Sequence, residues 1–264
     1  MFRRAATQNA EVSLILKLGA TERQPLEPFV AHLIGQARCS FVQKVAFGGM
    51  SHAQGIDSFV DPTEGVGCGA LLSALDRVTA PYVLVAYAPL VFHAARGSWV
   101  AEAIDRLERD AGLLCVTDQC GAAAGPAGSP RNRPKSRGPA RWDGHLHLWR
   151  RRKIASPAFV ASRDKLANAL ARVPSGIGDL ESALTAALRA SNADCGSLAG
   201  NDGWALGIEG KMSPEAAANL IALAEAGVFP ASLLGKSSLS LDEPSLLASW
   251  QRMALEIGSE AQRV

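Results

Sequence analysis

The sequence predicts an α/β fold in which a mainly parallel sheet is flanked by helices. Short runs of β-branched and aliphatic residues, typical of buried strands, recur along the chain, and residues 82–86 form the clearest one. Segments with apolar residues at helical spacing lie between these runs, as at 26–34. Strands that alternate with helices at this spacing predict crossover connections and helices on both faces of the sheet.

The individual elements follow from the same patterns, read in chain order. We expect strands at 12–16, 41–47, 82–86, 113–116, 145–149 and 157–160. We expect helices at 26–34, 70–78, 99–107, 166–173 and 180–188, one that begins at Ser213-Pro214-Glu215, and one that begins near Asp242. Ser213 is a preferred N-cap residue and Pro214 suits the first helical position. No internal repeat is visible.

Charge is distributed unevenly along the 264 residues. Residues 131–153 contain nine basic side chains and one acid, Asp143, a local balance of +8. The other 18 basic and 24 acidic residues give −6, so the total of +2 hides this basic segment. Such asymmetry points to an anionic partner or a bound phosphate, and the alternative is a solvated loop.

Residues 121–141 change in composition to Gly, Ala, Pro, Ser and Arg. This composition cannot bury a core, and we expect a long flexible loop because strand-like sequence resumes at His145. His145 and His147 are spaced to share one face of that strand. We expect them to fill a polar strand face, with metal binding as the alternative.

The composition excludes several classes of protein. With 48% apolar and 20% charged residues, the chain is globular and not collagen-like or disordered. The five cysteines are scattered without a Cys-x-x-Cys pair, which indicates buried thiols and neither a disulfide framework nor a zinc site. Charged residues interrupt every apolar stretch, and no signal-peptide pattern follows Arg3 and Arg4, so we expect a cytoplasmic protein.

The order of the elements and two local motifs resemble the family-2 glycosyltransferases, which have the GT-A fold. The resemblance covers residues 11–210. The glycine-rich helix start at 67–75, followed by the strand at 82–85, is the closest local match. Residues 158–166 are similar to the segment that delivers an acceptor-side residue. Gly178-Asp179-Leu180-Glu181 is similar to the Glu-Asp-x-x-Leu segment whose carboxylate is the catalytic base.

The resemblance implies a GT-A-like domain at 1–210 and a helical C-terminal extension at 211–264. It also implies transfer of a sugar from a nucleotide-sugar to a hydroxyl of a glycan or another acceptor. Asp179 is the implied base and Glu181 the alternative. Gly67, Gly69 and Tyr87 are the candidate substrate-binding positions outside the basic segment.

The chain departs from the family at its acidic positions. Ala86-Tyr87-Ala88 stands where the family has Asp-x-Asp, whose acids hold a divalent cation against the diphosphate. A divalent metal is therefore not expected. The acid that should follow the second strand is also missing at 46–51, and Asp57 and Asp61 substitute for it only if their loop bends back.

Two hypotheses about function remain. In the first, the chain is a metal-independent transferase in which Arg150, Arg151 and Arg152 clamp the diphosphate. In the second, it is a catalytically inactive GT-A-fold protein that binds or assembles with an active glycosyltransferase. The basic segment then serves as an electrostatic contact with that partner or with an anionic membrane surface.

Simpler structural roles compete with each of these assignments. Gly65, Gly67 and Gly69 suit a turn and a close helix-to-strand approach, and their spacing fits no phosphate-binding motif. Asp179 suits a helix N-cap. Nucleic acid is the least favoured partner because few aromatic residues are interleaved among the arginines and the pI is only about 8.3.

Overall fold

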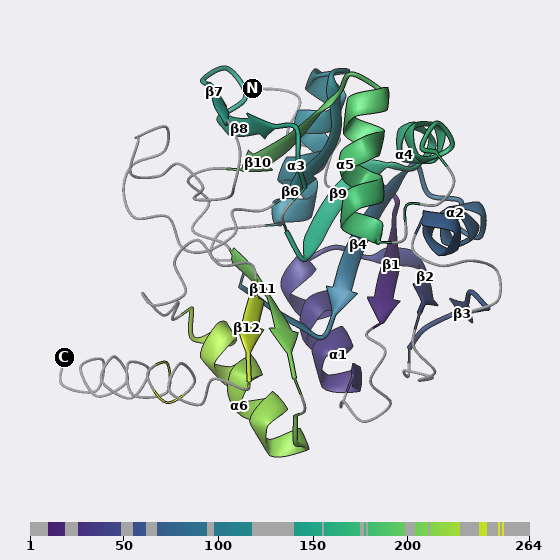
Figure 1. Ribbon diagram of the computed structural model, residues 1–264. Helices are drawn as coiled ribbons and strands as arrows, with labels where there is room; N and C mark the ends of the chain where they lie inside the picture. The colour runs from purple at the N-terminus through teal and green to yellow at the C-terminus, as the bar shows by residue number, and fades with distance from the viewer. Residues whose placement is uncertain are drawn as a thin grey trace.

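The computed structural model describes the chain in sections: residues 10–18, 26–48, 55–61, 68–93, 98–117, 140–154, 156–174, 177, 179–198, 204–210, 212–227, 238–241, 248 and 250. Most of the described strands belong to one nine-stranded sheet (Figure 1). In chain order they are β1 (Val12–Leu18), β2 (Phe41–Phe47), β3 (Ser58–Phe59), β4 (Tyr82–Ala88), β6 (Leu113–Thr117), β7 (Arg141–Asp143), β8 (Leu148–Arg151), β9 (Ala158–Ser162) and β10 (Asp194–Leu198).

The large sheet has the spatial order β3-β2-β1-β4-β9-β6-β10-β8-β7. Strands β3, β2, β1 and β4 are parallel neighbours, and β6 is parallel to β10. Strand β9 lies antiparallel between β4 and β6, and the β7–β8 hairpin adds an antiparallel edge. The predicted fold class, a mainly parallel sheet flanked by helices, is confirmed.

Helices cover both faces of this sheet. They are α1 (Leu26–Ala37), α2 (Cys68–Asp76), α3 (Trp99–Arg109), α4 (Arg163–Leu170) and α5 (Leu180–Ala190). Helices α1 and α3 pack on one face, and α2, α4 and α5 pack on the other. Alternate residues of β4 pack into the apolar cores on the two faces of the sheet, so β4 is buried on both sides. This is the burial that its continuous apolar run predicts.

A second, three-stranded sheet lies beside the first. Its order is β12 (Ser238–Ser240), β11 (Trp204–Glu209), β5 (Leu90–His93), and α6 (Pro214–Glu225) packs against it. Helix α6 begins as predicted, with Ser213 as N-cap and Pro214 in the first turn. The sheet joins strands from both sides of the predicted domain boundary at residue 210, and β12 adds a strand to the segment expected to be helical.

The strand predicted at 145–149 is confirmed only for Leu148 and Trp149, which begin β8. Residues 144–147 form the turn of the β7–β8 hairpin, and His147 adopts φ 51°. The carboxylate of Asp143 accepts hydrogen bonds from the backbone N–H groups of His145 and Leu146, which fixes the turn. The two histidines therefore do not share a strand face. Asp143-Gly144 is a turn signal that the apolar alternation obscured.

Other predictions fall on different parts of the chain. Most of the expected loop at 121–141 and most of the expected helix after Asp242 lie outside the described residues, as do Gly67 and Cys120. The four described cysteines are free thiols. Among the described residues, no helix combines the length and apolar character that crossing a membrane requires.

Candidate functional site

The carboxyl ends of β1 and β4 bring two side chains with reactive chemistry together. Lys17 on β1 is directly opposite Tyr87 on β4 in the parallel register. Lys17 comes two residues after Ile15, and Tyr87 comes two residues after Val85. Ile15 and Val85 are buried against the layer of α2, α4 and α5. Because side chains alternate along a strand, Lys17 and Tyr87 are on that same face. The carboxyl edge of a mainly parallel sheet is where α/β folds bind their ligands.

Helix α5 places its first turn at the same edge. The helix leads into β10, which is parallel to β6, so its N-terminus lies near the carboxyl ends of the strands. Figure 1 shows this end of α5 beside the ends of β4 and β1. Asp179 and Glu181, the two predicted catalytic carboxylates, flank the start of this helix. The structure thus brings Tyr87, Asp179 and Glu181 together from separate parts of the sequence.

Tyr87 occupies the middle of the position where the resemblance predicted two acids. Its hydroxyl is buried and has no hydrogen-bond partner within the described part of the chain. Burial raises the pKa of Tyr87 well above its usual value, and the negative charges of Glu181 and Asp179 raise it further. The phenol therefore stays protonated at neutral pH and is available as a hydrogen-bond donor.

Lys17 lies over the ring of Tyr87. The distance from Nζ to the ring centroid is 5.0 Å, within the range of a cation–π contact. Neighbouring parallel strands fix both backbones, and the ring limits where the ammonium group can lie. No observation in the sequence singled out Lys17. The signal that could have found it is its place directly after the first predicted strand, at 12–16.

Asp179 is the N-cap of α5. Its Oδ1 accepts a hydrogen bond of 2.7 Å from the backbone N–H of Ser182, which confirms the capping role. This hydrogen bond lowers the pKa of Asp179, and the positive charge of Lys17 adds to the effect. The exposed carboxylate therefore remains ionised at neutral pH, and its role as a base stays a prediction.

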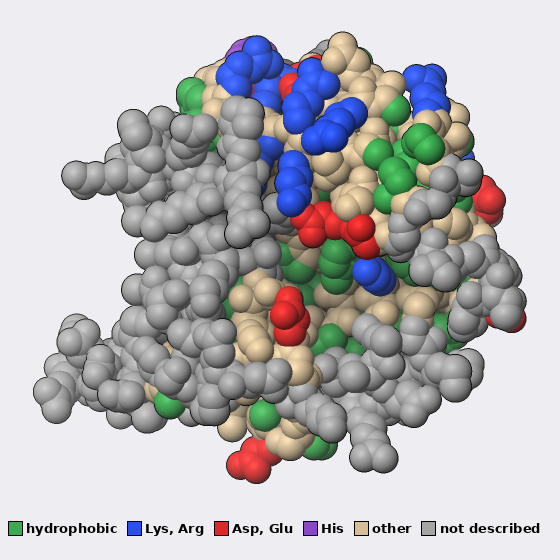
Figure 2. Space-filling model, viewed as in Figure 1, with side chains coloured by type: hydrophobic (Ala, Val, Ile, Leu, Met, Phe, Trp, Pro, Cys, Tyr) green, Lys and Arg blue, Asp and Glu red, His purple; other side chains and the backbone are tan. Residues whose placement is uncertain are grey.

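Glu181 is paired with the last residue of the basic segment. Lys153 Nζ lies 3.1 Å from Glu181 Oε1, and both side chains are about half exposed. We call Lys17, Tyr87, Lys153, Asp179 and Glu181 the edge site. Figure 2 shows acidic side chains beside a hollow with hydrophobic side chains in its floor, in the region where Figure 1 has the start of α5.

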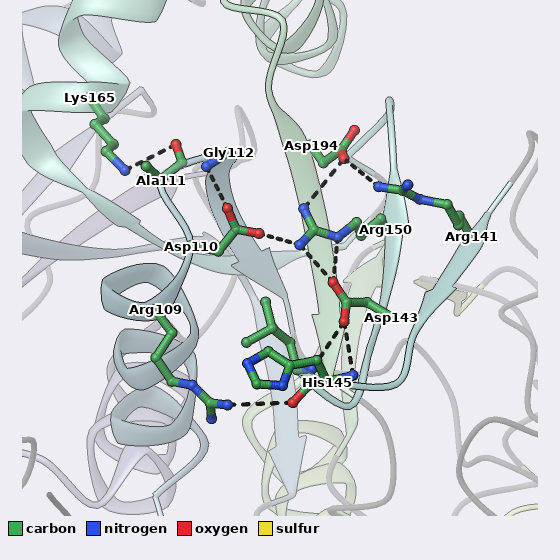
Figure 3. A network of polar contacts seen from close by, with 11 residues as sticks. Arg109, Asp110, Ala111, Gly112, Arg141, Asp143, His145, Arg150, Lys165 and Asp194 are labelled. Atoms are coloured by element: carbon green, nitrogen blue, oxygen red, sulfur yellow. Dashed lines mark hydrogen bonds and ion pairs between the residues drawn. The ribbon is translucent and has the colours of Figure 1, made fainter.

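The predicted clamp residues lie mostly elsewhere. Arg150 contacts three carboxylates at once: Asp110 at the shortest separation, Asp143 at 2.7 Å and Asp194 at 3.6 Å (Figure 3). Asp194 begins β10 and Asp110 precedes β6, so this network lies toward the amino edge of the sheet. The structure does not bring Arg150 to the edge site.

Arg151 and Arg152, the next two residues in the sequence, differ in burial and in their contacts. The Nε atom of Arg152 lies 2.9 Å from Asp194 Oδ1, so it belongs to the same network, whereas Arg151 is buried at 8% exposure. Figure 2 shows Lys and Arg side chains gathered over the part of the surface formed by the β7–β8 hairpin and its neighbours. In the described part of the basic segment, Asp110, Asp194 and Glu181 therefore offset part of the predicted +8 balance. A phosphate role for these arginines stays a prediction.

The glycine-rich helix start is described only in part. Gly69 lies in the first turn of α2, which begins at Cys68. The substrate-binding role expected of Gly67 and Gly69 therefore stays a prediction. Cys68 itself is half-buried, and burial raises the pKa of its thiol.

The edge site fits a divalent cation poorly. Position 87 offers a protonated phenol in place of a carboxylate. Asp179 is engaged in capping and Glu181 with Lys153. Across the described ranges, no group of three or more His, Cys, Asp or Glu side chains is arranged to hold a metal ion.

We compared the chain with protein families, curated proteins and solved structures, and only the solved structures gave matches. No protein-family model matches the sequence, and neither does any curated protein. A CMP:2-keto-3-deoxy-manno-octonic acid synthetase complexed with CTP is 12% identical, with a TM-score of 0.45 and coverage of 81% of this chain and 98% of that chain. GalNAc-T7 with UDP, GalNAc and Mn²⁺ is 10% identical, with a TM-score of 0.48 and coverage of 72% and 42%.

A third structure is glucosyl-3-phosphoglycerate synthase from Mycobacterium tuberculosis in complex with Mn²⁺, UDP and phosphoglyceric acid. It is 11% identical, with a TM-score of 0.43 and coverage of 84% of this chain and 78% of that chain. The chain thus spans less than half the length of GalNAc-T7 and most of the other two.

The order of the elements is the one that the sequence resemblance implied. Strand β1, helix α1, strand β2, the glycine-rich start of α2, strand β4, helix α3 and strand β6 follow one another as expected. The sequence departs from the pattern of the resembled family at the ends of β2 and β4. These departures change which side chains are available there and leave the order of the elements unchanged.

Proposed function

We propose that the edge site binds a nucleoside-diphosphate sugar and transfers its glycosyl group to an acceptor hydroxyl. The observation that carries this proposal is the convergence of Tyr87, Lys17, Asp179 and Glu181 at the carboxyl edge of β1 and β4. A hydrogen-bond donor, a fixed cation and two ionised carboxylates are the groups that this transfer needs around the reacting bond.

Asp179 is the base in this proposal, and Glu181 is the alternative. The carboxylate accepts the proton of the acceptor hydroxyl as the acceptor oxygen attacks the anomeric carbon. The bond from that carbon to the diphosphate oxygen breaks, and its electron pair leaves with the nucleoside diphosphate. A carboxylate whose pKa is lowered stays ionised at neutral pH, so it is ready to accept the proton.

Tyr87 serves as a donor near the leaving group. The two neighbouring carboxylates help to keep its proton in place, so the hydroxyl can donate to a phosphate oxygen and cannot compete as a base. Cationic residues must balance the charge that develops on the leaving diphosphate. The sequence assigns this role to Arg150, Arg151 and Arg152. Arg150, however, lies in the network at the amino edge of the sheet, away from the edge site.

Calorimetric titration tests the proposal directly. The full chain is titrated with UDP, GDP, CMP and the corresponding nucleotide-sugars, in Mn²⁺, in Mg²⁺ and in chelator. We expect at least one nucleoside diphosphate to bind. In the presence of an acceptor, we expect the corresponding nucleotide-sugar to release or transfer its sugar slowly. No binding under any condition would overturn the proposal.

The inactive-partner hypothesis is the second candidate. The observation that favours it is the replacement of the acidic pair by Ala86-Tyr87-Ala88. It predicts that the chain forms a stable complex with an active glycosyltransferase, detected by co-purification and size-exclusion chromatography of the two purified proteins. Turnover of a nucleotide-sugar by the isolated chain would contradict this hypothesis.

A further inference from the structure

A diphosphate at the edge site needs positive charge close to it. A nucleoside diphosphate carries two or more negative charges, and the two carboxylates nearby add repulsion. Glu181 already has Lys153 at 3.1 Å, which offsets one of them. The charge of the ligand must therefore be balanced by another group at the ends of β1 and β4.

Lys17 is in the right position to balance the charge of the ligand. It is opposite Tyr87 in register, and its Nζ lies 5.0 Å from the centre of the ring. Within the part of the chain that the structure describes, no carboxylate oxygen lies within 4.0 Å of Lys17 Nζ, so its charge is not used up by an ion pair. An ammonium group offers three donors and acts as a compact charge toward phosphate.

The strand pairing makes Lys17 a fixed cation. Strand β1 has β2 on one side and β4 on the other, so its backbone cannot shift without disrupting both pairs. The Tyr87 ring restricts the side chain as well, which makes Tyr87 a positioning residue for Lys17. A cation held in place before the ligand arrives loses less conformational freedom on binding than one on a free side chain.

We propose that Lys17 binds the diphosphate and that nucleotide binding by this chain requires no divalent cation. This inference rests on the proposed function. It explains why the end of β4 needs no acidic pair: the charge comes from the neighbouring strand. Because this cation belongs to the protein, the affinity for the nucleotide depends on the charge of Lys17 and not on the concentration of Mn²⁺ or Mg²⁺.

The test compares variants of the full chain by calorimetric titration with UDP, GDP and CDP, in chelator and in Mn²⁺. Lys17→Met keeps the length and apolar stem of the side chain but removes the charge, and Lys17→Gln is a second neutral variant. Lys17→Arg keeps the charge. Lys165→Met is the matched control, because Lys165 on α4 is partly buried like Lys17 and its Nζ donates to Ala111 O.

We expect the unmodified chain to bind equally well in chelator and in Mn²⁺. Neutral variants at position 17 should bind about 10- to 100-fold more weakly, since a hydrogen bond to a charged group is lost. Lys17→Arg and Lys165→Met should stay within a few-fold of the unmodified chain. Thermal unfolding of each variant confirms that it is folded.

Three results would overturn the inference in distinguishable ways. Binding that appears only with Mn²⁺ or Mg²⁺ would refute metal independence but leave the proposed function standing. Binding in chelator that the neutral variants do not weaken would remove Lys17 and also leave the proposed function standing. Absence of nucleotide binding under every condition would overturn the proposed function, and this inference with it.

Discussion

Lys153 Nζ lies 3.1 Å from Glu181 Oε1, so the end of the basic segment contacts the first turn of α5. Both side chains are about half exposed, and exposed pairs contribute little because water screens the charges. We expect Lys153→Met to change the free energy of unfolding by less than about 1 kcal/mol. A double-mutant cycle with Glu181→Gln, measured by urea unfolding, should give a coupling energy of about 0.5 kcal/mol. A coupling of several kcal/mol would mean that the pair is buried in solution.

Two roles of Asp179 can be separated by substitution. Asp179→Ser removes the carboxylate but keeps a good N-cap, so the free energy of unfolding should hardly change while transfer is lost. Asp179→Ala removes both the carboxylate and the N-cap, so it should also lower the free energy of unfolding. The measurements are transfer rate and urea unfolding. Undiminished transfer by Asp179→Ser would exclude Asp179 as the base and leave Glu181.

Arg150 is expected to hold the amino edge of the sheet together. Its side chain is 12% exposed and contacts Asp110, Asp143 and Asp194. Arg150→Met leaves these carboxylates to repel one another without a counter-charge, which should cost about 3 kcal/mol of unfolding free energy. Arg109→Met is the control, since Arg109 is more exposed and contacts Asp105 and a backbone carbonyl. Equal stability of the two variants would contradict a structural role for Arg150.

The same network predicts a specific dependence of stability on pH. Partial burial acts to raise the pKa of Asp110 and of Asp143, but the hydrogen bonds and charge of Arg150 outweigh it and lower both values. A lowered pKa in the folded state contributes stability that is complete above about pH 5 and is lost as the pH falls through the lowered values. We expect Arg150→Met to flatten this acid limb in urea unfolding measured from pH 6 to pH 2. An unchanged limb would mean that other carboxylates dominate it.

Two glycines give substitutions of opposite sign. Gly227 ends α6 at φ +74°, and a Cβ there would lie 2.9 Å from His93 Cε1. Gly227→Ala should therefore destabilise the fold by about 1–2 kcal/mol. Gly35 lies within α1 with open space at the Cβ position, so Gly35→Ala should stabilise by about 0.5–1 kcal/mol. Thermal unfolding of the two variants gives the signs, and a stabilising Gly227→Ala would show that His93 yields readily.

The sequence predicts the strands and helices of the large sheet well, because each is marked by local periodicity. The run at 82–86 became β4, and Ser213-Pro214 became the start of α6. The direction of β9 could not be predicted, since an apolar run reads the same in parallel and antiparallel neighbours. The turn at 144–147 was missed because alternating apolar residues outweighed the Asp143-Gly144 signal.

The candidate site was predicted only in part. Tyr87 was selected from one segment and Asp179 with Glu181 from another, and the fold brings the two segments together. Lys17 was missed because its importance depends on the register of β1 with β4, which no local pattern carries. Arg150 was selected for its charge, but charge alone does not tell where the compensating Asp110 and Asp194 lie.

Strand β5 begins two residues after β4 ends, yet it belongs to the other sheet. Tyr87 is therefore tied, through a very short piece of chain, to the apolar core that contains Phe29, Trp204 and Trp250. Separation of α6 from α1 would uncover this aromatic surface and favour self-association. It would also loosen β5, which follows the strand that carries Tyr87, so loss of ligand affinity and aggregation should appear together when the C-terminal segment is removed.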